Sequence, residues 1–179
     1  GKPEVTDIIP AEGFDEDYVL RLSASIESGS EHPLGQAIVR KAVERKLELM
    51  PLKDFQAIPG KGVMGLLDNK VITVGNPKML EDIYSKTTLP DWVENGLSRL
   101  EGEAKTAMIV AKNGNIEAIL AVADSLKDDS ILSIQELEKM GIKTIMLTGD
   151  NRRTAEAIAK KVGISQVLAE VLPDGKVNA

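Results

Sequence analysis

The pattern of apolar residues changes once along this chain, close to residue 124, and this change predicts two units of different architecture. Before it, short strand-like segments are joined by turn sequences, with helical segments inserted in pairs. After it, apolar strands and amphipathic helices alternate one by one. Hairpin-linked strands form antiparallel sheets, whereas strand–helix alternation forms parallel ones. We therefore expect an α+β unit up to about residue 123 and an α/β unit after it.

In the first unit, turn and cap residues mark where elements begin and end. Pro33 and Pro77 stand at first helical positions, where a proline loses no hydrogen bond. Asp68-Asn69 and Asn113-Gly114 are hairpin turns by composition. Strands are expected at 4–9, 53–58, 62–67, 70–74, 106–111 and 116–123, and helices at 15–28, 33–46, 76–83 and 91–100. The prediction is an antiparallel sheet flanked by helix pairs.

In the second unit, the apolar strand 142–147 has no polar alternation, which is typical of a parallel sheet covered on both faces. A second strand is expected at 166–170. Helices are expected at 129–140 and 151–162, and each is followed by a glycine.

Composition excludes several kinds of site and partner. The chain has no cysteine and a single histidine, so thiolate metal sites and zinc sites with two or more histidines are excluded. A bound metal would be a hard cation held by carboxylates and phosphates, which indicates Mg²⁺. The net charge of −6, with both signs interspersed, argues against a nucleic-acid surface. Apolar runs are too short to cross a bilayer, so we expect no membrane insertion by this chain.

Three short segments carry candidate chemistry. Thr148-Gly149-Asp150-Asn151 joins an apolar strand to a helix, where free backbone N–H groups and the helix dipole favour a phosphate, and Asp150 can hold Mg²⁺. The alternative is a capping turn without a ligand. Gly60-Lys61-Gly62 and Gly65 fit a G-x-G-x-x-G pattern, but between two strands, which disfavours a dinucleotide fold. These glycines permit a turn or close approach by a ligand or another strand.

The third segment, from Glu27 to Leu34, forms the corner between two predicted helices. There Glu27 can accept a hydrogen bond from an exocyclic amine, and His32 can stack on a flat heterocycle. The alternative is a helix that begins at proline, with a solvated histidine in the preceding loop.

Taken together, these segments resemble the heavy-metal (P1B) class of P-type ATPases. The resemblance spans essentially the whole chain, and its Ser-Glu-His-Pro-Leu segment is characteristic of that class. In order, the matching segments are Ser30-Glu31-His32-Pro33-Leu34, Gly60-x-Gly62, Val74-Gly75-Asn76, Thr148-Gly149-Asp150-Asn151 and Pro173-Asp174-Gly175-Lys176.

The resemblance implies an α+β nucleotide-binding domain over residues 10–123. It also implies that this domain is joined to an incomplete α/β, haloacid-dehalogenase-like phosphorylation domain built from residues 1–9 and 124–179. It implies ATP binding by Glu27, His32, Gly60, Gly62, Gly75 and Asn76. It also implies that Thr148, Asp150 and Lys176 act on the γ-phosphoryl group, with Asp150 contacting Mg²⁺. The implied partners are the remainder of a pump, namely its actuator domain and transmembrane metal path, and the implied location is the cytoplasmic side of the cell membrane. Copper is the expected cargo, with zinc and cadmium left open.

Two family segments have no counterpart in this sequence: the Asp-Lys-Thr-Gly-Thr segment with the nucleophile, and a Gly-Asp-Gly-x-Asn-Asp segment that binds magnesium. We therefore expect this polypeptide to bind ATP without being phosphorylated. We also expect residues 124–179 to be less stable than 10–123, because the strand 142–147 would lack a neighbour.

Two alternatives stay open at this point. The first is a haloacid-dehalogenase-like phosphatase with a cap domain, for which Asp15 and Asp17 offer the required spacing of the nucleophile motif. No apolar strand precedes them, which counts against it. The second is a non-catalytic module that senses nucleotide, which would show ATP affinity without turnover.

Overall fold

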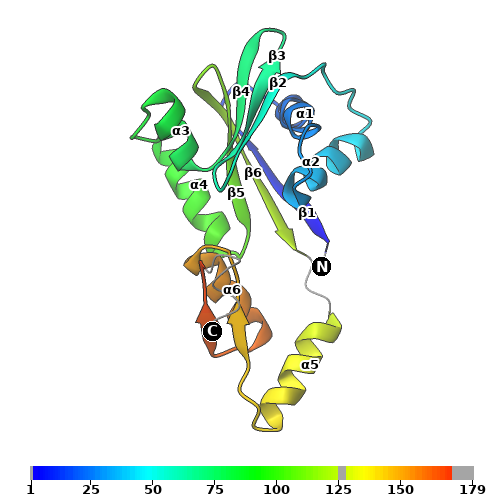
Figure 1. Cartoon of the computed structure of the whole chain (residues 1–179), viewed down its shortest axis with the longest axis vertical. Helices are drawn as coiled ribbons and strands as arrows, with labels where there is room; N and C mark the ends of the chain where they lie inside the picture. The colour runs from blue at the N-terminus through cyan, green and yellow to red at the C-terminus, as the bar shows by residue number, and fades with distance from the viewer. Residues whose placement is uncertain (1, 125–127, 171–179) are drawn as a thin grey trace.

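The computed structural model describes residues 2–124 and 128–170, which form a six-stranded sheet followed by a two-stranded one (Figure 1). The larger sheet is antiparallel throughout, in the order β1-β6-β5-β4-β3-β2. Its strands are β1 (Pro3–Pro10), β2 (Lys53–Ile58), β3 (Gly62–Leu67), β4 (Lys70–Gly75), β5 (Thr106–Lys112) and β6 (Asn115–Asp124). The predicted antiparallel architecture is confirmed.

Two helix pairs cover the two faces of this sheet (Figure 1). Helices α1 (Glu16–Glu27) and α2 (Pro33–Glu44) pack on one face, and α3 (Pro77–Tyr84) and α4 (Asp91–Gly102) on the other. Because side chains alternate along a strand, Leu120 of β6 enters the core under the first pair and Ile119 the core under the second. Both side chains are fully buried.

The tight turns form as predicted. Asp68 and Asn69 have φ values of 48° and 60°, and Asn113 and Gly114 have values of 49° and 81°. Left-handed conformation at both central residues gives the turn twist that matches two flanking strands. These turns fix the β3–β4 and β5–β6 registers.

The smaller sheet pairs β7 (Ile145–Leu147) and β8 (Gln166–Leu168) in parallel, with α6 (Arg152–Val162) between them and α5 (Asp128–Lys139) before them. The strand predicted from Ile142 is too long. The Ile142 amide donates to the Leu137 carbonyl over 3.0 Å, and the Thr144 amide donates to Glu138 over 3.1 Å. Residues 142–144 therefore complete the end of α5 and do not enter the ladder.

The first strand pairs with the larger sheet along its length, from Pro3 opposite Asp124 to Pro10 opposite Ala118. Arg40 of α2 adds a 2.7 Å hydrogen bond from Nη2 to the Pro3 carbonyl. In this structure residues 3–9 thus belong to an edge strand of the six-stranded sheet. Their assignment to the second unit stays a prediction about domains.

Helix α6 lies against α4 through polar contacts. Arg153 Nη1 donates to Ser98 Oγ over 2.7 Å and lies 3.7 Å from the Glu101 carboxylate, and Lys161 Nζ lies 3.3 Å from the Glu103 carbonyl. Through this contact the start of α6 is held near the end of the six-stranded sheet (Figure 1). Among the described residues no helix is both long enough and apolar enough to cross a membrane.

Candidate functional site

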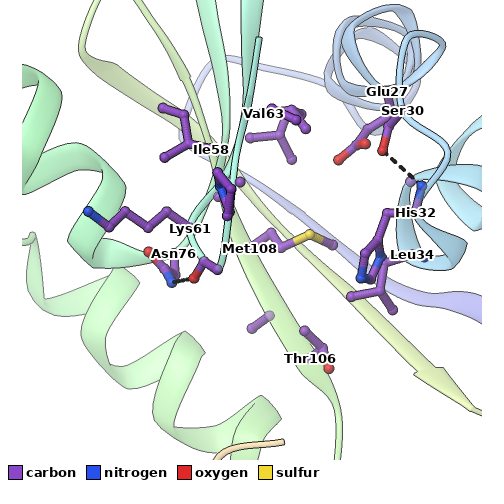
Figure 2. Close-up of a pocket in the computed structure, with 18 residues that line it drawn as sticks. Glu27, Ser30, His32, Leu34, Ile58, Lys61, Val63, Asn76, Thr106 and Met108 are labelled. Carbon is purple, nitrogen blue, oxygen red and sulfur yellow. Dashed lines mark hydrogen bonds between the residues drawn. The ribbon is translucent and has the colours of Figure 1, made fainter. Parts of the chain in front are cut away.

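A cavity of about 320 Å³ opens between the α1–α2 corner, the β2–β3 loop and strands β4 and β5 (Figure 2). All six residues predicted to bind nucleotide line it: Glu27, His32, Gly60, Gly62, Gly75 and Asn76. Thr106 and Met108 of β5 complete its wall. The sequence did not single them out, because nothing distinguishes them from ordinary strand residues before the chain is folded.

His32 is fixed by its own backbone turn. It is the N-cap of α2, and its Nδ1 accepts a hydrogen bond from the Leu34 amide over 3.2 Å. The Ser30 hydroxyl accepts from the His32 amide, also over 3.2 Å (Figure 2). With Nδ1 acting as acceptor, the neutral ring carries its proton on Nε2, which leaves a donor for a ligand.

Glu27, the last residue of α1, is the buried acid of the cavity, with only 4% of its surface exposed. Burial raises its pKa from 4.5 to about 7, and the neighbouring Ser30 hydroxyl lowers it by a smaller amount. Its carboxylate packs directly on the backbone of Gly35, where a Cβ atom would lie 2.2 Å from Oε2. A side chain at Gly35 would therefore displace the acid.

Asn76 shapes the cavity through the loop that it holds. Its Oδ1 caps α3 by accepting from the Met79 amide over 3.1 Å, and its Nδ2 donates to the Gly60 carbonyl over 2.9 Å (Figure 2). Its backbone amide donates to the Lys61 carbonyl over 2.8 Å. Both ends of the side-chain amide are engaged within the chain, so Asn76 positions the Gly60 loop.

The glycines of the cavity serve two different purposes. Gly62 and Gly75 face each other across β3 and β4, and an added Cβ atom would lie 2.2 Å from the Val74 carbonyl or 2.4 Å from the Lys61 carbonyl. Close approach of the two strands therefore requires glycine at both positions. Gly60 has a φ of 72° and open space around it, so it leaves room beside the cavity.

A second cavity, of about 230 Å³, adjoins this site and reaches the start of α6. It shares His32, Leu34 and Thr106 with the first cavity and extends to Asp124 and Asp150. The predicted base-binding corner and the predicted phosphate loop thus lie on one path, with His32 between them.

The Thr148–Asn151 loop is closed by short-range hydrogen bonds. Thr148 Oγ1 donates to Asp150 Oδ2 over 2.9 Å and accepts from the Asp150 amide over 3.1 Å. Asn151 caps α6 by accepting from the Thr154 amide over 2.9 Å. Lys176, the third predicted catalytic residue, lies outside the described residues.

The Asp150 carboxylate of this loop can bind a hard cation, but the loop alone does not form a complete metal site. The described residues contain no group of three or more His, Cys, Asp or Glu side chains around one point. Asp150 is exposed and offers one carboxylate. A Mg²⁺ ion held here would take its other oxygen ligands from phosphate and water, as this ion commonly does.

The aspartates of the phosphatase alternative have structural roles. Asp15 Oδ1 accepts from the Tyr18 amide over 2.8 Å as the N-cap of α1, and Asp17 pairs with Arg45 at 2.8 Å. Neither follows a strand of a parallel sheet, where a nucleophile of this kind is expected.

The haloacid dehalogenase-like hydrolase family matches residues 1–179, and the chain belongs to that family. Within it, the chain is a homologue of copper-exporting P1B-type ATPases. It is 45% identical over its full length to a copper-transporting ATPase of Rhizobium meliloti, and 48% identical over 98% of its length to a probable copper exporter of Archaeoglobus fulgidus. It spans 21% of each of these relatives, about a fifth of their length.

Solved structures agree on the fold. A zinc-transporting PIB-type ATPase in its E2.Pi state matches 99% of this chain with a TM-score of 0.74 and 34% identity, over 28% of its own length. The N-domain of a copper-transporting P-type ATPase matches 68% of this chain and 99% of its own, with a TM-score of 0.56 and 26% identity. The six-stranded sheet with its helices matches that N-domain.

Proposed function

We propose that this chain is the ATP-binding part of the cytoplasmic catalytic region of a copper-transporting P-type ATPase. The observation that carries the proposal is the cavity itself, which gathers six residues from three separate segments of the sequence. A family resemblance based on scattered motifs requires such a gathering, and chance matches would not produce it.

ATP would lie along the path formed by the two cavities. The adenine end would sit beside Glu27 and His32, against the apolar side chains of Val63 and Met108. The phosphates would pass Thr106 towards Asp150 and the N-terminus of α6, where the helix dipole favours negative charge. Mg²⁺ would neutralise the phosphate oxygens there, and Lys176 would stabilise the transferring phosphoryl group.

The remaining parts of the proposal concern the longer protein. The partners would be an actuator domain and a transmembrane metal path, with this chain on the cytoplasmic side. We propose copper as the cargo because the relatives transport copper. One matching structure is of a zinc transporter, so we propose that residues elsewhere in the longer protein determine which metal is carried. We propose that residues 1–179 supply the ATP site, and that the phosphorylated aspartate belongs to another part of the longer protein.

The single histidine gives a direct test, because the imidazole signals in an NMR spectrum belong to His32 alone. Titration with Mg-ATP should move these signals to saturation, and Mg-GTP should move them little. A Gly35→Ala variant, whose Cβ displaces the Glu27 carboxylate, should weaken the response to ATP. Absence of any response to ATP up to millimolar concentration in the folded wild-type protein would contradict the proposal.

A further inference from the structure

We propose that Glu27 meets the adenine base as a neutral carboxylic acid, so that the protonation state of one buried side chain selects adenine over guanine. This inference rests on the proposed ATP site and specifies how its base-binding end works. It is carried by where the structure places the carboxyl group and by what surrounds it.

The surroundings of Glu27 disfavour a charge. The carboxyl group is directed from the end of α1 into the cavity, whose wall includes the apolar side chains of Leu34, Val63 and Met108 (Figure 2). The Gly35 backbone lies close to one carboxyl oxygen, and only 4% of the Glu27 surface is exposed. Removing a carboxylate from water without a compensating cation favours its protonated form.

Among the described residues, no cation contributes to the pKa of Glu27, so its burial is not compensated by an opposite charge. Around α1 the charged groups of α2, β1 and the β2–β3 loop are occupied elsewhere: Arg40 on the Pro3 carbonyl, Lys41 with Glu44, Asp7 with Lys105, and Lys61 with Asp82. Strand β3 carries no titratable residue, and Lys70 of β4 lines a different cavity with Arg21. Glu4 of β1 and Glu31 of the α1–α2 loop are exposed acids, and His32 uses Nδ1 on the Leu34 amide.

Two helix ends act on Glu27 in opposite directions. As the last residue of α1 it lies at the negative end of that helix, which disfavours an anion, and it also lies beside the first turn of α2, which favours one. The larger contribution is burial, and the net result is a pKa of about 7. At neutral pH the free protein therefore holds much more of Glu27 in the neutral acid form than an exposed glutamate would.

The two forms fit different bases. Adenine presents an acceptor at N1 beside a donor at its exocyclic amine, and a neutral acid matches this pair by donating from one oxygen and accepting at the other. Guanine presents two donors at N1 and its exocyclic amine, which an ionised carboxylate matches by accepting at both oxygens. Ionisation of Glu27 should thus reverse its preference, and adenine binding above neutral pH should require uptake of a proton.

The test compares wild-type protein with Glu27→Gln, whose amide is the nearest uncharged analogue of the acid. ATP and GTP dissociation constants are measured by isothermal titration calorimetry between pH 6.5 and pH 9, in buffers of different ionisation enthalpy. The ratio of wild-type to Glu27→Gln constants cancels every pH effect that the two proteins share, including those of the nucleotide phosphates and the imidazole. Glu31→Gln, an exposed position in the same loop, is the matched control.

For ATP, the wild-type to Glu27→Gln ratio should rise by about tenfold per pH unit above neutrality. At pH 8.5 wild-type protein and Glu31→Gln should each take up about one proton more than Glu27→Gln on binding ATP. Over the same range the ATP preference over GTP should fall for wild-type protein and remain for Glu27→Gln.

A pH-independent ratio, with equal proton uptake, would overturn the inference and leave the ATP site standing. If wild-type protein and Glu31→Gln fail to bind ATP at every pH, the proposed function itself is wrong. Should Glu27→Gln not fold, wild-type proton uptake in the paired buffers decides, together with the carboxylic-acid carbonyl band in the infrared difference spectrum at pH 8.5. A band that appears with ATP supports the inference, and its absence contradicts it.

Discussion

The six-stranded and two-stranded parts of this chain contain equally apolar strands but bury them very differently. Among the described residues, every fully buried leucine and isoleucine side chain lies between Leu20 and Leu120, in the two cores of the larger sheet. Among the described residues of the smaller part, the buried apolar side chains are Ala155, Ala159 and Val162. Several of its larger apolar residues are exposed, by 74% at Met140 and 55% at Ile145, and the others are half-buried. The apolar residues of a strand thus indicate the environment that the strand suits, whereas the number of neighbouring strands decides whether the strand is buried.

The difference follows from how each sheet is assembled. Antiparallel hairpins bring neighbours together through two-residue turns, and two helix pairs then cover both faces. A parallel pair needs a crossover helix for each added strand, and two strands bury little area on their own. The comparison predicts that the larger unit holds most of the stability of this chain.

The largest expected effect is in amide hydrogen exchange. Amides of β5 and β6 should exchange at least about a thousandfold more slowly than those of β7 and β8, because the former open only when the larger core unfolds. Mass spectrometry of the exchanged protein after pepsin digestion resolves the two regions. Equal protection of the amides in both sheets would contradict the predicted difference in stability between the two parts.

The next effect concerns single side chains. Ile119→Ala removes a fully buried side chain from the core beneath α3 and α4, and should lower the free energy of unfolding by about 3–4 kcal/mol. Met140→Ala, at an exposed position, should change it by less than about 0.5 kcal/mol. Urea unfolding followed by the fluorescence of Trp92, the single tryptophan, reports on the larger unit. Equal losses for the two variants would show that the smaller part is packed in a way the structure does not show.

The third effect is the pH dependence of the stability of the larger unit. The pKa of Glu27 is about 7 in the folded protein and 4.5 without burial, so the folded state binds the proton more tightly, and stability falls as pH rises between these values. Glu27→Gln cannot ionise. It should therefore be more stable than wild-type protein by about 3 kcal/mol at pH 8, and by less than about 1 kcal/mol at pH 5. The same urea experiment at both pH values measures this difference, and a pH-independent difference would refute the burial argument.

The smallest effect concerns the contact between the two parts. Arg153→Ala removes the hydrogen bond to Ser98 and the ion pair with Glu101, both exposed, and should change stability by less than about 1 kcal/mol. Exchange of the α6 amides should nevertheless increase, because α6 is then held by fewer contacts to α4. Arg152→Ala is the control, since Arg152 pairs within α6 with Glu156. Equal exchange in both variants would show that the polar contact does not hold α6 in place.

Local sequence rules predicted nearly all elements of the fold, and the resemblance to P1B-type ATPases predicted the residues that gather at the site. Asp68-Asn69 specifies its turn by itself, and Pro33 marks the start of a helix in any context, so these positions are readable without a structure. The prediction that residues 142–144 belong to a strand was wrong, because their hydrogen bonds back to α5 outweighed their apolar character. Thr106 and Met108 were missed because their place in the cavity depends on sheet order, which links residues far apart in sequence.

The double use of Asn76, as helix cap and as the residue that holds the Gly60 loop, has a consequence for how the protein ages. Spontaneous deamidation of asparagine begins when the backbone nitrogen of the next residue attacks the side-chain amide. That nitrogen belongs here to Pro77, which carries no hydrogen and cannot form the cyclic intermediate. The amide that holds the Gly60 loop is thus protected from this reaction, whereas Asn113, followed by Gly114 in an exposed turn, is open to it. Deamidation should therefore occur in the β5–β6 hairpin long before it occurs at the cavity.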